Sequence, residues 1–425
     1  MKYLEVYHDK NPSSTVVVQA DQNNRFYRFF VSVPLCVLVF KKLCIPFYFI
    51  DGTFHKTANY DGVLIQLCGK HGFGGSLRLC SAWVPTESAA HFAFFVLTMK
   101  NSGFDIENVP FMSDRGHLLA AGRLLNTVCG ITISVKYCME HIIRNTIGKF
   151  HIKKPAIPLL RKVISAMQGS DTFEKFLRNT HDLVEKFEDV GKEIAVYIMR
   201  IHPRHWTVFG NLETIPDTYW MDNYANLLRD LFSRCGTMDQ CDLDELNNTD
   251  LFYNNIPIGK KFPLFGICRN NTSESAVSSV GREGVRYATP PIAIKLWLEN
   301  SHMVLERFIE KVKKINHLQV PYSSIGMKFF NDSLVTHNLS VDYLSIDDRS
   351  YEMLVNNDNG KTAHKCWVKN DDRCSCQCPT FQMYRMMCTH LGKGLRHLKH
   401  FGYICGLTTG AVSASVFPNF VLMKI

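Results

Sequence analysis

An apolar run leads into an aspartate at two places in this sequence. The residues from Pro46 to Ile50 predict a buried strand and are followed by Asp51, and a shorter run that starts at Val109 leads in the same way into Asp114. A turn is the ordinary explanation of one such aspartate, because Asp-Gly is a common turn dipeptide. Two strands that end alike are harder to explain as two turns. Since ligands of open α/β sheets lie at the carboxyl ends of strands, the pattern favours a ligand site at one edge of a sheet.

The segments around these aspartates alternate between the periodicity of strands and that of helices. Three strand-like runs are followed by a helix, a strand, a second helix and a last strand. Their ranges are 46–54, 61–74, 76–86, 87–103, 109–114, 116–130 and 131–139. This order is typical of a mixed sheet with helices between its strands. The fold class that we predict is therefore α/β with a mixed sheet.

The sequence changes character after this block. From about 142 to 265 it is first helical and mixed in charge and then polar, acidic and rich in turn residues, which predicts a helical insertion. A long helix is predicted from 290 to 315, because the prolines at 290 and 291 suit the first turn of a helix.

Composition indicates an ordinary globular protein. Of the 425 residues, 46% are hydrophobic and 20% are charged, and this length allows two or three domains. The most apolar run, 29–40, has twelve residues, too few to span a bilayer, and it predicts a strand pair or a buried core. The first residues lack the apolar stretch of a secretory signal. We therefore expect a soluble, intracellular protein without a membrane partner.

Net charge and cysteine usage give information about the binding partner and the redox compartment of the protein. The net charge of +9 favours an anionic partner such as nucleic acid, although only weakly. Most of the fifteen cysteines stand singly in apolar runs, as Cys68, Cys80 and Cys268 do. Such cysteines usually behave as small buried hydrophobic residues in a reducing compartment.

The two aspartates suit a divalent cation if their strands are neighbours. Carboxylate oxygens are the ligands that Mg²⁺ and Mn²⁺ prefer, and two such ions can activate a nucleophile and stabilise the leaving oxygen in phosphoryl transfer. That chemistry usually needs a third carboxylate, and Glu274 stands where the pattern turns helical again. The alternative is that Glu274 only favours the start of a helix, with Ser273 or Thr272 as the cap.

A cluster of cysteines near the C-terminus predicts a second metal site. Cys374, Cys376, Cys378, Cys388 and His390 lie within seventeen residues. Tetrahedral Zn²⁺ needs four ligands, which Cys376, Cys378, Cys388 and His390 supply. So short a segment buries little surface by itself, so metal binding and folding would be linked. Two alternatives stay open at this point: reduced cysteines without a metal, and a Cys-x-Cys pair formed by Cys374 and Cys376.

Five short motifs, in this order, resemble those of Mutator-like element (MULE) transposases. They are FIDGTFHKTANYDGVLIQLCG, WVPTESAAHFAFFV, FMSDRGHLLAA, YCMEHIIRN and NNTSESAV. The resemblance covers about 46–315 and implies an RNase H-like catalytic domain that carries its helical insertion at about 142–265. It implies that Asp51, Asp114 and Glu274 form a DDE triad that holds Mg²⁺ or Mn²⁺. It also implies a nuclear enzyme that cuts transposon ends, joins them to target DNA and works as a homo-oligomer.

The resemblance includes one further matching element and one departure. Cys138 and His141 match a Cys-x-x-His element of the family, for which we favour a structural role or a role in bracing the active site over a role as metal ligands. The family often has asparagine three residues after the third carboxylate, where this chain has Val277. This departure removes no metal ligand.

The cysteine cluster resembles a SWIM zinc finger, in which Cys-x-Cys is followed by Cys-x-His. Phe381, three residues after Cys378, matches the aromatic residue of that module and favours Cys376 with Cys378 as the first pair. The resulting division of the chain is an N-terminal segment 1–45, the RNase H-like domain 46–315, the SWIM-type module 340–400 and a tail 401–425. MULE transposases commonly carry such a finger after the catalytic domain, so the two resemblances support each other.

A different function is compatible with the same motifs. Domesticated relatives of these transposases act as catalytically silent DNA-binding transcriptional regulators, and they keep the fold and the finger but need not keep all three carboxylates. All three positions are filled here, which favours an enzyme. A decayed or truncated copy of an element is a third alternative, since only about 45 residues precede the first catalytic strand, where the family often has a DNA-recognition domain.

Overall fold

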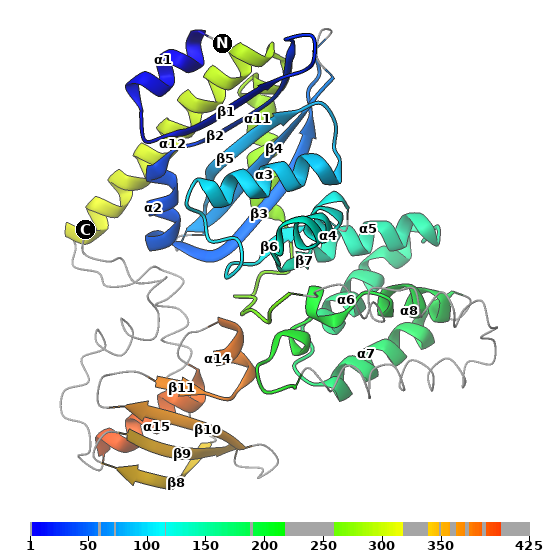
Figure 1. Cartoon of the computed structure of the whole chain (residues 1–425). Helices are drawn as coiled ribbons and strands as arrows, with labels where there is room; N and C mark the ends of the chain where they lie inside the picture. The colour runs from blue at the N-terminus through cyan, green and yellow to red at the C-terminus, as the bar shows by residue number, and fades with distance from the viewer. Residues whose placement is uncertain are drawn as a thin grey trace.

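A mixed sheet of seven strands occupies the N-terminal part of the protein (Figure 1). The computed structural model describes residues 2–57, 61–71, 74–114, 116–187, 190–216, 259–317, 339–347, 350–357, 363–369, 374–384 and 388–400. The strands are β1 (Thr15–Ala20), β2 (Phe26–Ser32), β3 (Cys44–Phe54), β4 (Val63–His71), β5 (Ser76–Val84), β6 (Phe111–Ser113) and β7 (Val135–Tyr137). Their order across the sheet is β1-β2-β5-β4-β3-β6-β7. Strand β3 is antiparallel to β4 and parallel to β6, and β6 is parallel to β7.

The elements predicted between residues 46 and 139 are all present. Strands β3, β4 and β5 are followed by helix α3 (Ala89–Asn101), strand β6, helix α4 (His117–Cys129) and strand β7. The predicted class, α/β with a mixed sheet, is therefore confirmed. Helix α4 ends at Gly130, whose φ of 66° is the left-handed conformation that glycine adopts at no steric cost.

The N-terminal segment 1–45 adds to this sheet. It contains helix α1 (Lys2–Lys10), strands β1 and β2, and helix α2 (Pro34–Leu43). The predicted strand pair at 29–40 is wrong in its second half, because Pro34 begins α2 at a position where its missing N–H costs no hydrogen bond. The alternative of a buried core is the better description, since Val37 and Phe40 are buried.

Alternate residues of the strands face two different layers of helices. In β2, Phe30 packs against Phe95 of α3 with ring centroids 5.6 Å apart, whereas Phe29 faces the other side and contacts Trp83 of β5 at 5.6 Å. Trp83 in turn meets Trp297 edge to face at 6.2 Å. Trp297 belongs to α12 (Pro290–His317), the long helix that the sequence predicted at 290–315. The sheet is thus covered by α3 on one face and by α12 on the other (Figure 1).

A buried arginine fixes helix α11 (Asn271–Arg282) to the sheet. Arg78 of β5 is 7% exposed and donates from both terminal nitrogens to the carboxylate of Glu283, each at 2.7 Å. It also donates to the hydroxyl of Ser279, at 2.5 Å. Two parallel charge-assisted bonds define an orientation as well as a distance, so this contact sets how α11 lies against β3, β4 and β5. A short helix, η5 (Val285–Tyr287), connects it to α12.

The described part of the predicted insertion is helical. It contains α5 (Met139–Lys149), η1 (Lys154–Ala156), α6 (Ile157–Gln168), α7 (Phe173–Lys186), α8 (Gly191–Met199), η2 (Pro203–His205) and η3 (Phe209–Asn211). Its last predicted part falls mostly on residues 217–258, which lie outside the described residues. A buried lysine ties the insertion to the sheet, because Lys136 of β7 donates to the carbonyl of Arg204 at 2.9 Å and to Asn211 Oδ1 at 2.7 Å.

A second, smaller sheet follows α12 along the chain. It contains β8 (Leu339–Asp347), β9 (Ser350–Asn357), β10 (Ala363–Lys369) and β11 (Cys374–Cys376), in the order β11-β10-β9-β8, together with α14 (Pro379–Tyr384) and α15 (Thr389–His400). All its strand pairs are antiparallel. The Phe265 N–H donates to the Met383 carbonyl at 2.7 Å and the Glu213 N–H to Gln382 Oε1 at 2.8 Å, so α14 is joined to the insertion. The predicted tail 401–425 lies outside the described residues.

Within the described ranges, no helix combines the length and the apolar character needed to cross a bilayer.

Candidate metal centres

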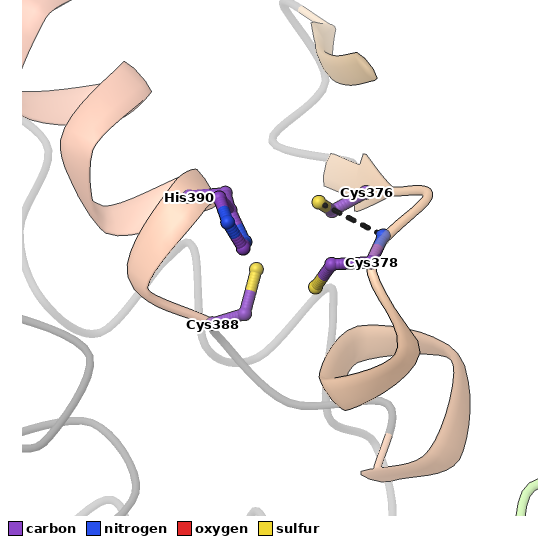
Figure 2. A group of neighbouring side chains, drawn as sticks. All are labelled: Cys376, Cys378, Cys388 and His390. Atoms are coloured by element: carbon purple, nitrogen blue, oxygen red, sulfur yellow. Dashed lines mark hydrogen bonds between the residues drawn. The ribbon is translucent and has the colours of Figure 1, made fainter. Parts of the chain in front are cut away.

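Four side chains of the small C-terminal sheet and its helices converge on one point. Figure 2 shows Cys376 and Cys378 opposite Cys388 and His390. One ligand atom from each lies within 4.8 Å of all the others. The three cysteines are buried and His390 is partly exposed. These are the four residues that the sequence indicated as zinc ligands, and Cys374 lies outside the group. The group has the size and the donor atoms of a structural zinc site, three thiols and an imidazole.

Local backbone geometry orients the thiols. Cys378 Sγ accepts the N–H of Phe381 at 3.4 Å, and Cys388 Sγ accepts the N–H of Leu391 at 3.5 Å. Both bonds join residues three apart at the start of a helix, which is the pattern of a helix N-cap. Cys376 Sγ accepts the N–H of Cys378 at 3.4 Å (Figure 2). Hydrogen bonds from Cys376, Cys388 and His390 to its sulfur, and from the Phe381 N–H, lower the pKa of the Cys378 thiol, which favours the thiolate that a metal binds.

Asp51 and Asp114 lie side by side in the large sheet. Tyr48 pairs with Phe111 and Phe49 with Met112 in the parallel ladder of β3 and β6. Two further steps of the same register bring Asp51 opposite Asp114, which follows the last residue of β6. On its other side Asp51 pairs with Gln66 of β4, and β3 continues to Phe54. The explanation of Asp51 as a turn residue is therefore wrong, because the Asp-Gly pair lies inside a strand.

Glu274 is in the first turn of α11, as the sequence predicted. The helix starts earlier than the proposed caps would allow: its N-cap is Asn270, which lies two residues before Thr272 and three before Ser273. Asn270 is 1% exposed and donates from Nδ2 to the carbonyl of Ile50 at 3.0 Å. This bond ties the start of α11 to the residue directly before Asp51.

Cys138 braces the same helix start. Its buried sulfur accepts the N–H of Asn270 at 3.2 Å, and its own N–H donates to the Ser113 carbonyl at 2.9 Å, next to Asp114. Cys138 thus links the ends of two strands to the helix that carries Glu274, which is a structural contact. Neither Cys138 nor His141 belongs to a group of metal-binding geometry among the residues described.

The charges of the carboxylates act on one another. Burial, followed by the charge of Asp114, raises the pKa of Asp51 from 3.8 to about 7. The charges of Glu274 and Glu87 raise this pKa further. The Gly52 N–H, which donates to Asp51 at 2.9 Å, lowers it. Burial and the charge of Asp114 likewise raise the pKa of Glu87. A Cβ on Gly52 would lie 3.0 Å from Glu87 Oε1, so the glycine leaves room for this carboxylate.

Glu87 is a member of the site that the sequence analysis missed. The sequence pattern puts it at the start of the helix after β5. The N-cap of that helix is Ser88, whose hydroxyl accepts the His91 N–H at 3.3 Å. The one available signal is its position directly after the strand predicted at 76–86, which resembles the signal that singles out Asp51 and Asp114.

Arg144 of α5 places a cation beside the third carboxylate. Its Nη1 is 3.6 Å from Glu274 Oε1 and its Nε is 3.5 Å from Glu140 Oε1. Glu140 already pairs with both terminal nitrogens of Arg161, whose hydrogen bonds lower the pKa of that carboxyl. The Arg144 side chain is 55% exposed, so it is not fixed in place by packing.

The carboxylates fit a hard divalent cation by their chemistry but are less tightly gathered than the thiols. Glu274 Oε1 is buried without a hydrogen-bond partner, and Asp51 lies beside the like charge of Asp114. A bound cation would offset the cost of both features. Among the described residues, however, only the Cys376, Cys378, Cys388 and His390 group has all its ligand atoms within 4.8 Å.

The fold and these sites define an α/β protein with a mixed sheet and a C-terminal Cys₃His group that could bind a metal such as zinc. No protein-family model matches the chain, and no curated protein matches it either.

Proposed function

We propose that this protein is a DNA transposase of the Mutator-like class, in which Asp51, Asp114 and Glu274 hold Mg²⁺ or Mn²⁺ for the cleavage and joining of DNA strands. Two such cations would supply an activated nucleophile and stabilise the leaving oxygen. The Cys₃His group would hold a structural Zn²⁺ and assist binding to DNA or to another subunit. The enzyme would act in the nucleus as a homo-oligomer, on transposon ends and target DNA.

The observation that carries this proposal is the convergence of carboxylates from distant parts of the chain. Asp51 lies beside Asp114 in the register of β3 and β6, and the charge of Glu274, far along the sequence, acts on Asp51. Acidic side chains repel one another, and burying them together costs stability. A protein retains such an arrangement most readily where a cation or a positively charged ligand offsets the cost.

The strand order supports the RNase H-like fold that the proposal needs. The first of the five predicted strands, β3, is central; β4 and β5 follow on one side as antiparallel neighbours, and β6 and β7 on the other as parallel ones. Strands β1 and β2 extend this arrangement beyond β5. In this arrangement Asp51, within β3, would share a cation with Asp114 and Glu274 at the carboxyl end of β6, the kind of position where ligands of such sheets bind.

A plasmid-nicking assay tests the proposal without knowledge of the target sequence. The purified chain is incubated with supercoiled plasmid DNA in the presence of Mg²⁺ or of Mn²⁺. We expect metal-dependent nicking that Asp51→Asn, Asp114→Asn and Glu274→Gln each abolish, while Asp61→Asn, an exposed carboxylate before β4, leaves it unchanged.

The same assay separates the alternatives. Cleavage that survives Asp51→Asn or Asp114→Asn would contradict the assignment of the site. If wild type and variants all bind DNA but none cleaves it in either metal, the catalytically silent regulator is the correct function.

A further inference from the structure

A fourth thiol lies against the Cys₃His group. Cys366 of β10 is fully buried, and its sulfur is 3.4 Å from Cys376 Sγ, toward which the Cys366 thiol donates. Cys366 lies outside the group of four whose ligand atoms are mutually within 4.8 Å. Cys366 therefore contacts one metal ligand, Cys376, but is not itself one of the four ligands.

The backbone holds these two cysteines at the closest distance that a sheet permits. Cys366 and Cys376 are direct partners in the antiparallel ladder of β10 and β11. The next pair along, Lys365 with Gln377, is the hydrogen-bonded one, because the Gln377 N–H donates to the Lys365 carbonyl at 3.0 Å. Hydrogen-bonded and non-hydrogen-bonded pairs alternate in such a ladder, so Cys366 and Cys376 form a non-hydrogen-bonded pair. In such pairs the Cα atoms are about 4.5 Å apart and the side chains approach each other most closely, within the range that a disulfide spans.

From this geometry we infer that Cys366 and Cys376 form an oxidative modification site at which peroxide converts a metal ligand into a disulfide. Hydrogen peroxide oxidises the Cys376 sulfur, which is a thiolate when it binds the metal, to a sulfenic acid. The peroxide is itself reduced, and its second oxygen leaves as water after taking up a proton. The Cys366 thiol then attacks the Cys376 sulfur. The S–S bond forms, the S–O bond breaks, and the hydroxide leaves as water with the proton of Cys366.

The consequence is loss of the metal. A sulfur in a disulfide has no thiolate charge to offer, so the site falls from four ligands to three. Because a structural metal contributes to the folding of a small module, its release would loosen β11, α14 and α15 together. Reduction of the disulfide by a thiol restores the ligand. This inference concerns the Cys₃His group alone and does not depend on whether the chain cleaves DNA.

Cys374 provides a matched control on the same strand. It is two residues from Cys376 and lies opposite Val368, so it has no cysteine as its partner in the ladder. Cys374→Ser therefore removes a nearby thiol without removing the resolving one.

The experiment uses the full chain loaded with Zn²⁺ and treated with hydrogen peroxide. Zinc release is followed with a chromogenic chelator, and the cysteine linkages are mapped by peptide mass spectrometry. We expect wild type and Cys374→Ser to release zinc, to form the Cys366–Cys376 cross-link, and to bind zinc again after reduction with dithiothreitol. In Cys366→Ser that cross-link is absent, and the zinc release is less readily reversed by dithiothreitol, because Cys376 has lost the thiol that lies opposite it in the ladder.

Two results would overturn the inference. One is equally reversible zinc release in Cys366→Ser. The other is a wild-type protein that releases zinc with its cross-link between other cysteines, or with none. The second result is read from wild type alone, so it holds even if the serine variant fails to fold.

Discussion

The two candidate metal centres are assembled in different ways. The ligands of the Cys₃His group come from two short stretches, Cys376 to Cys378 and Cys388 to His390, and their atoms lie within 4.8 Å of one another. The carboxylates come from β3, the end of β6 and the start of α11, and they do not form so tight a group. The thiol site thus depends mainly on local turns, whereas the carboxylate site depends on the pairing of the whole sheet.

Charge explains part of the difference. Thiols can be neutral and can share hydrogen bonds at short distances, as Cys366 and Cys376 do. Carboxylates at neutral pH are charged, and two unit charges 4 Å apart repel each other by about 4 kcal/mol at the effective dielectric of a protein surface. Burial, and after it the repulsion from Asp114, raise the pKa of Asp51. Without a bound cation, charged carboxylates therefore stay further apart than neutral thiols do.

The largest effect is expected at the thiol site. Cys388→Ser removes one of four ligands, and since structural zinc contributes about 10–16 kcal/mol to the folding of small modules, the C-terminal module should unfold and its zinc content should fall from about one per chain to almost none. Elemental analysis and circular dichroism of the purified variant measure both. Cys374→Ser, outside the group, should keep its metal. Unchanged zinc in Cys388→Ser would mean that the ligands lie elsewhere.

A smaller effect, with a defined pH dependence, is expected at Asp51. Its folded pKa of about 7 lies above the ordinary value of 3.8, so the protonated carboxyl suits the folded state. The folded protein should lose stability as pH rises from 3.8 through about 7, by up to about 4 kcal/mol. Asp51→Asn should remove this loss, which makes the variant more stable than wild type above about pH 8 and equal to it near pH 4.

Urea unfolding over this pH range measures the difference. The exposed Asp61→Asn should follow the wild-type curve throughout. If Asp51→Asn were less stable than wild type at high pH, the carboxylate would be compensated in the folded protein and the contrast between the two sites would disappear.

The smallest effect concerns the cation beside Glu274. Arg144 Nη1 lies 3.6 Å from Glu274 Oε1, and the Arg144 side chain is largely exposed. Removal of Arg144 should let Mn²⁺ bind more tightly, because the arginine competes with the cation for the same carboxylate. Exposed ion pairs contribute up to about 1 kcal/mol, so Arg144→Ala should tighten binding at most about fivefold. Calorimetric titration of the full chain with Mn²⁺ measures this, with Arg144→Lys as the charge-preserving control. Weaker binding in Arg144→Ala would show that the arginine supports the site and does not compete for it.

Sequence patterns predicted most of the large sheet and the composition of the thiol site. The strands and helices between 46 and 139 have clear periodicity and clear boundary residues, and all are present. The spacing of Cys376, Cys378, Cys388 and His390 was equally informative, because only one residue separates the two members of each pair. Residues 29–40 were less clear, since an apolar run this short does not distinguish a strand from a helix.

Other members of the sites could not be identified in advance. Glu87 resembles any glutamate at a helix start, and Asn270 and Cys366 resemble ordinary polar and buried residues until their contacts are known. Asn270 matters because it bonds to Ile50, and Cys366 because it lies opposite Cys376. Each of these roles depends on a partner on another element, and sequence spacing contains no information about that partner.

The sequence by itself determined which segments become strands and helices, and which short turns bring cysteine and histidine together, because these depend on periodicity and on neighbours a few residues apart. Only the tertiary structure decided that Asp51 lies beside Asp114, that α11 carries Glu274 to the same edge, and that Cys366 touches a metal ligand. Those arrangements follow from the register of the strands and the packing of helices on the sheet. Register and packing are set by hydrogen bonds and burial summed over the whole domain, so no single segment specifies them.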